Sequence, residues 1–145
     1  MFWQLDDDDW REAFGSAGEE VIYGAPEASV NPVPGSRATS APFRRADVTL
    51  LLGLTPGEPD GADWVCAGRL NDGRWFCLRA GCAYSGWDVS SIGHASVALS
   101  LADLLRLGMD AGERSRCSLN VDLAMLEGAD DEYVEREIAL LALRG

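Results

Sequence analysis

The chain contains no lysine and only one histidine, His94, among its 145 residues. General-base and nucleophilic mechanisms most often use a histidine, so in this chain the commonest catalytic arrangements could only use His94. Twelve arginines supply all the formal positive charge against 24 acids, and the net charge is −12. Because phosphate binding needs concentrated positive charge, the composition argues against direct binding to nucleic acid.

Long apolar runs are also missing. No run approaches the ~20 residues that span a bilayer, and residues 1–6 lack the basic start and apolar core of a signal peptide. We therefore expect a cytoplasmic protein without membrane contact. In a reducing compartment its four cysteines are expected to be buried and reduced. The length and the hydrophobic content of 47% suit one compact domain over residues 1–145.

A zinc site is the one metal site that the composition makes conceivable, since thiolates and imidazole suit zinc. Its ligands would be Cys77, Cys82, His94 and Cys117. Only the first two are close in sequence, whereas structural zinc sites usually combine two close pairs. The chain also lacks the glycine-rich phosphate-binding motifs and the HExxH motif. We expect neither a metal nor a cofactor, and the sequence argues against catalysis.

Composition divides the chain into three regions. Residues 1–14 combine the acids Asp6–Asp9 with aromatic residues that include Trp10, so they suit either an amphipathic helix docked on the core or an arm that binds a partner. Residues 15–42 are rich in Gly, Ala, Ser and Pro, and predict a long surface loop. Residues 43–145 are expected to form an α+β core that ends in an acidic helix.

A β-hairpin over about 63–81 is the clearest local prediction. Two runs of aromatic and apolar residues flank a polar turn at 71–73, whose Asp-Gly pair tolerates positive φ. A third strand is expected at about 94–99. Residues 43–54 fit either a short helix or a buried strand, and their apolar spacing slightly favours the helix. Within the hairpin, Arg79 is an anomaly among apolar neighbours.

Helices are expected after the third strand. Ser100 and Asp103 resemble a capping box, with Asp in the place of the usual Glu, and predict a helix over about 100–107. Asp110 is a candidate N-cap for a second short helix, and residues 130–143 predict a terminal helix with acids at its start. Three antiparallel strands followed by helices give an α+β fold with a small antiparallel sheet.

Residues 81–88 read Gly-Cys-Ala-Tyr-Ser-Gly-Trp-Asp. Glycines permit a tight backbone path and rings can anchor it, so the segment suits an ordered loop. With the hairpin before it and residues 100–108 after it, the segment resembles a pattern in uncharacterised proteins of actinobacteria and their phages. The resemblance covers about the middle third of the chain and implies no activity. The candidate ligand residues at this loop are Tyr84, Trp87, Asp88 and His94.

The acids concentrate at the two ends of the chain. Residues 1–30 hold eight acids against one arginine, and residues 126–145 hold six against two. An acidic surface suits a basic partner. The favoured hypothesis is a non-enzymatic protein-binding module, such as a phage-encoded or toxin-neutralising inhibitor, whose carboxylates engage a basic nucleic-acid-binding protein. Its candidate contact residues are Asp6, Asp7, Asp8, Asp9, Trp10, Glu132 and Glu135.

Two alternatives stay open. The first is a small ligand-binding domain or enzyme that uses the 81–88 loop with His94, because nucleophilic sites are assembled in space from distant residues. The second is a structural or assembly protein whose acidity serves only solubility.

Overall fold

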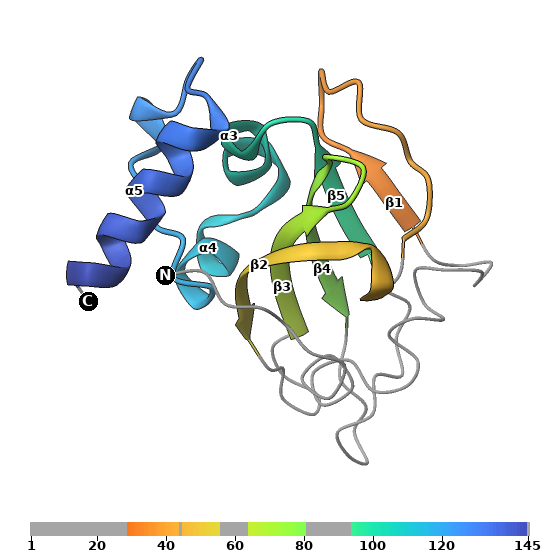
Figure 1. Cartoon of the computed structure of the whole chain (residues 1–145), viewed down its shortest axis with the longest axis horizontal. Helices are drawn as coiled ribbons and strands as arrows, with labels where there is room; N and C mark the ends of the chain where they lie inside the picture. Colours follow the sequence, from red (N-terminus) through yellow and green to blue (C-terminus); the bar gives the residue numbers. More distant parts are fainter. Residues whose placement is uncertain (1–28, 44, 56–63, 81–93, 145) are drawn as a thin grey trace, which may run out of the picture.

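The computed structural model describes residues 29–43, 45–55, 64–80 and 94–144. The described residues form a mixed five-stranded sheet in the order β1-β5-β4-β3-β2, with helices beside it (Figure 1). The strands are β1 Ser29–Pro32, β2 Val48–Thr55, β3 Trp64–Leu70, β4 Trp75–Ala80 and β5 His94–Ala98. This confirms the α+β class. Strands β2 to β5 run antiparallel, as expected, whereas β1 joins β5 in parallel and makes the sheet mixed.

The predicted hairpin is β3 and β4. Trp64 pairs with Ala80 at its open end, and Arg69 pairs with Trp75 next to the turn. Gly73 has φ +93°, a conformation that glycine adopts without strain. The third strand, β5, pairs with β4 as the order along the chain suggests. These strands lie where turn-forming residues and an alternation of apolar and polar residues occur within a few positions of each other.

The helix favoured for residues 43–54 is wrong. A single 3₁₀ turn, η1 Arg45–Asp47, is followed by the eight-residue strand β2. The register of β2 against β3 shifts at two places, and each shift changes which face of the sheet the following side chains lie on. The apolar residues of β2 therefore lie on both faces, although their spacing in the sequence also fits a helix. Leu51 is buried on one face and Leu52 on the other. Long-range pairing has overridden a weak local preference.

Residues 15–42 do not all form a loop, because Ser29–Pro32 is strand β1. Val30 is buried in the core, and Val33 N donates to Val97 O at 2.9 Å just beyond the strand. Pro32 ends a strand at the edge of the sheet, where a missing N–H is tolerated. A strand this short gives no readable alternation in the sequence.

The helices agree with the predicted positions. They are α3 Leu101–Asp103, the π-helical turn η2 Leu104–Gly108, α4 Ala111–Arg116, the 3₁₀ turn η3 Leu123–Met125, and α5 Asp131–Arg144. Ser100 Oγ accepts from Asp103 N at 3.2 Å, and Asp110 with Glu113 forms a complete capping box. The π turn was not predicted. No helix within the described residues is long and apolar enough to cross a membrane.

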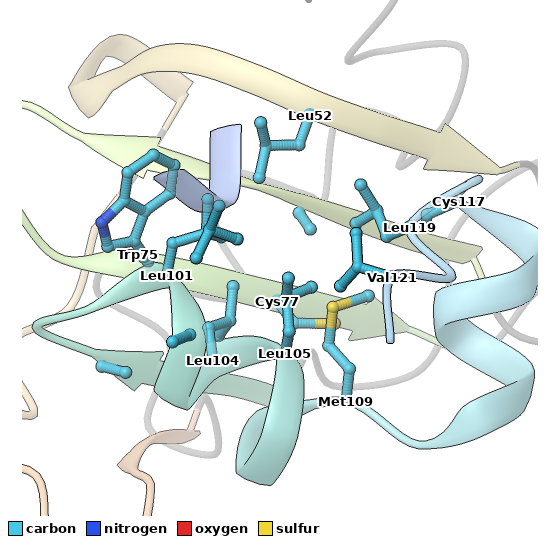
Figure 2. Close-up of a cluster of buried hydrophobic side chains, with 14 of the residues drawn as sticks. Leu52, Trp75, Cys77, Leu101, Leu104, Leu105, Met109, Cys117, Leu119 and Val121 are labelled. Carbon is cyan, nitrogen blue, oxygen red and sulfur yellow. The ribbon is translucent and has the colours of Figure 1, made fainter. Parts of the chain in front are cut away.

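Both faces of the sheet are buried. On the first face, Phe76 and Leu78 of β4 pack with residues from every other strand and with Ala38 and Phe43. On the second face, Trp75 and Cys77 pack against the helices, as Figure 2 shows. The alternation expected in β4 is therefore correct, and each half of it faces its own apolar cluster.

One carboxylate fixes the start of α5 on the second face. Trp75 Nε1 donates to Asp131 Oδ2 at 3.0 Å, and Leu101 N donates to Asp131 Oδ1 at 2.8 Å. Val134 and Ile138 of α5 then bury their side chains in the same cluster. Asp131 thereby connects β4, the start of α3 and the start of α5. These contacts fix which side of α5 faces the solvent.

Candidate functional site: an acidic face on the terminal helix

The predicted site residues fall into two groups. Asp6–Asp9, Trp10 and the loop residues Tyr84, Trp87 and Asp88 lie outside the described residues, as does the whole segment 81–88. His94 is the first residue of β5, is exposed, and lies opposite Arg79 in the sheet register. Glu132 and Glu135 lie on α5.

The cysteines of the proposed zinc set do not form a reactive site among the described residues. Cys77 and Cys117 are buried and form no disulfide, and Cys82 lies outside the described ranges. Burial raises the pKa of Cys117 to about 11 and raises the pKa of Cys77 further, although Arg79 opposes the shift at Cys77. Both thiols are therefore protonated at neutral pH and are poor nucleophiles. No group of three potential metal ligands occurs in the described parts of the chain.

Arg79, the anomaly of the hairpin, is the centre of a polar network. Its Nε and Nη2 donate to the carboxylate of Glu113 at 2.5 and 3.1 Å. Nη2 also donates to Gly108 O at 2.8 Å, and Nη1 donates to Ser96 Oγ at 3.2 Å. The network ties β4 to the π turn and to the start of α4. Its charge is compensated by Glu113, so Arg79 has a structural explanation.

The surface from the residue before η3 to the middle of α5 is strongly acidic. Residues 122–137 hold seven acids against Arg136 alone, whereas the described residues together hold twelve acids against ten arginines. The acidity is thus local rather than spread over the described part of the molecule. We call this surface the acidic face; its acids are Asp122, Glu127, Asp130, Asp131, Glu132, Glu135 and Glu137.

Helix capping explains three of these acids. Asp122 Oδ1 accepts from Ala124 N at 3.0 Å, Asp130 Oδ1 accepts from Tyr133 N at 2.8 Å, and Asp131 holds Trp75. Carboxylates at a helix start also interact favourably with the helix dipole. The four glutamates make no capping contact of this kind among the described residues. Their negative charge is therefore not used to cap the start of a helix.

The charges on this face interact. Glu135 is half-buried, and its pKa is raised, first by this partial burial and then by the neighbouring carboxylates of Asp131 and Glu132, while Arg69 opposes the shift. The ion pair between Glu132 and Arg136 is 3.8 Å long and highly exposed, so it neutralises little of the field. A cation placed near Glu135 would therefore be attracted by several carboxylates at once.

Apolar side chains continue the outer side of α5. Leu140 and Leu143 are exposed, and Leu140 follows Arg136 by four residues, which places both on one side of the helix. Met125 in η3 is also exposed. Exposed apolar side chains bordered by charged ones resemble the apolar core and polar rim of a protein interface.

The sequence located Glu132 and Glu135 but not the extent of the face. Glu127 and Glu137 were omitted, although a charge count over residues 122–137 would have found both. Comparison with protein-family models, curated proteins and solved structures finds no match to this chain.

Proposed function

We propose that the protein is a non-enzymatic binding module that engages a basic protein through the acidic face. The observation that carries the proposal is the excess of glutamate at the start of α5, beyond the acids that cap the helix. Exposed charge of one sign steers an oppositely charged partner and selects it. The partner class we propose is a nucleic-acid-binding protein, because such proteins concentrate positive charge to bind phosphates.

The sequence adds a second acidic group to this proposal. Asp6–Asp9, with Trp10, supply four carboxylates and an aromatic ring of the type enriched in protein interfaces. An inhibitor that offers carboxylates in place of phosphates would compete with nucleic acid for its partner. Because burial keeps the thiols of Cys77 and Cys117 protonated, neither of these two cysteines supports a thiol-based reaction.

The test begins with a pull-down from host lysate at low salt, eluted by a salt gradient and analysed by mass spectrometry. We expect a basic nucleic-acid-binding protein that is released by salt and displaced by DNA. The affinity of the identified partner is then measured for Glu132→Gln combined with Glu135→Gln. Exposed charge pairs contribute roughly 0.2–1 kcal/mol each, so we expect about a tenfold loss at low salt and a shallower salt dependence.

A matched control removes two acids elsewhere. Asp47→Asn combined with Asp103→Asn changes the net charge equally but leaves the acidic face intact. We expect this variant to bind as the wild type does. If the partner keeps its affinity and its salt dependence after Glu132 and Glu135 are neutralised, the acidic face is not the binding surface.

A further inference from the structure

A small hollow lies between the sheet and the terminal helix. Its volume is about 140 Å³, and its walls are residues 52–54 of β2, residues 116–118 at the end of α4, and Ile138 and Ala142 of α5. Six of its eight lining residues are apolar, and together with Arg116 and Ser118 they give a lining that is polar and apolar in about equal parts. A cavity of about this size admits a benzene-sized group. The hollow can therefore take one apolar side chain.

The walls of the hollow are held in place by specific contacts. A Cβ on Gly53 would lie 2.6 Å from Cys117 O, so β2 and the segment after α4 are in direct backbone contact. Thr55 Oγ1 donates to Arg116 O at 2.9 Å on the same side. Ile138 is buried in the second apolar cluster and fixes the helical wall. Such a preformed hollow costs little ordering when a ligand enters it.

The hollow adjoins the acidic face. Residues 135, 138 and 142 are spaced by three and four, so Glu135, Ile138 and Ala142 share one side of α5. The helical rise places Glu135 about 10 Å from Ala142 along the axis. Asp131 and Glu132 precede Glu135 on the same helix, so carboxylates gather beyond the Ile138 end of the hollow, where Arg69 offsets part of their charge.

The hollow also lies along the edge of the sheet. Among the described residues, β2 hydrogen-bonds only to β3, and no residue of β2 is charged. Edge strands without charge or proline are suited to receive an extended segment. In an extended segment, three residues span about 10 Å, which matches the separation between Glu135 and the far wall of the hollow at Ala142.

We propose that this hollow holds an apolar side chain of an extended, basic segment of the partner protein, with a lysine or arginine about three residues away at Glu135. The inference rests on the proposed function and specifies how the partner is held. Charge complementarity selects the occupant, because a basic segment is attracted to Glu135, Glu132 and Asp131. The apolar anchor supplies affinity and the basic side chain supplies orientation.

The experiment pans a phage library of random twelve-residue peptides against the full chain. The affinity of enriched peptides is then measured by fluorescence anisotropy at low salt. Enriched peptides should carry an apolar residue and a basic residue about three positions apart. Ala142→Phe fills the hollow without a change of charge and should weaken binding at least tenfold. Leu107→Phe adds a ring at an exposed apolar position of η2, outside the hollow and the acidic face, and should leave binding unchanged.

The outcomes separate this inference from the proposed function. If Glu132→Gln with Glu135→Gln weakens peptide binding but Ala142→Phe does not, the acidic face binds and the hollow inference is overturned. If neither variant has an effect, both proposals fail. Enriched peptides that need the hollow but lack a basic residue would overturn the assignment of a basic segment. A change of oligomeric state on Ala142→Phe would assign the hollow to a second copy of the chain and would also overturn it.

Discussion

Removal of Glu113 should destabilise the fold more than removal of the whole Arg79–Glu113 pair. The side chains of Arg79 and Glu113 are only 22% and 13% exposed, so solvent cannot replace the lost partner fully. Breaking a buried ion pair costs roughly 3–5 kcal/mol, and partial exposure puts this pair at the lower end. Glu113 Oε1 also accepts from Asp110 N in the capping box, a contribution of about 1 kcal/mol. We expect Glu113→Ala to cost about 4 kcal/mol.

Two further variants divide this cost into its parts. Glu113→Gln keeps an oxygen for Asp110 N but removes the charge, and should cost about 2 kcal/mol. Arg79→Leu combined with Glu113→Ala leaves no buried charge, although Gly108 O loses a donor. Because replacing both partners avoids an uncompensated charge, we expect the double variant to cost about 2 kcal/mol, less than Glu113→Ala alone.

The free energy of unfolding is measured by urea denaturation, with circular dichroism and tryptophan fluorescence as two probes of the same transition. For a chain of this length, a loss of about 4 kcal/mol corresponds to a melting temperature lower by roughly 8–16 °C. A cost below about 1 kcal/mol for Glu113→Ala would refute the reasoning. So would a double variant whose cost equals the sum of the costs of Glu113→Ala and of Arg79→Leu measured separately, since the charges would then not be coupled.

Two other variants test single features. The pKa of Glu135 is raised above its ordinary value of 4.5, so the folded state holds this proton more tightly than the unfolded state, and the associated stability is lost as the pH rises through the folded pKa. Glu135→Gln should raise the urea midpoint at pH 7, and the gain should vanish below about pH 4; an equal effect at both pH values would contradict this. Gly53→Ala should cost about 2 kcal/mol because its Cβ meets Cys117 O, whereas Gly112→Ala, in a helix, should be neutral or stabilising, and equal effects would show that the two backbones move apart easily.

Local signals were enough to predict the hairpin, the third strand and the terminal helix. Each has a turn or a cap within a few residues of its apolar pattern, as at Gly73 and Ser100. Strand β2 was misread because two register shifts against β3 change which of its residues face the core, and nothing in residues 43–54 encodes those shifts. Strand β1 is too short to alternate, and its place beside β5 depends on a segment more than 60 residues away.

The candidate site was predictable only in its charge. Composition located Glu132 and Glu135 on a helix, because a run of acids at a helix start is visible in the sequence. The hollow joins segments near Gly53, Cys117 and Ile138, and no local pattern connects them. For the same reason the partner of Arg79 could not be read from the hairpin, since Glu113 lies 34 positions along the chain.

Neighbouring acids of the terminal helix differ in their structural roles, and this difference makes the binding proposal testable. Asp131 accepts hydrogen bonds from Trp75 and from the start of α3, so its loss would disturb the core and any surface that α5 presents. Glu132 is exposed, and its ion pair with Arg136 contributes little to stability. Neutralising Glu132 should therefore change binding without unfolding, whereas Asp131→Asn should lower both. If both variants lower the binding of the partner only in proportion to the fraction of unfolded protein, binding depends on the fold and not on the charge of Glu132.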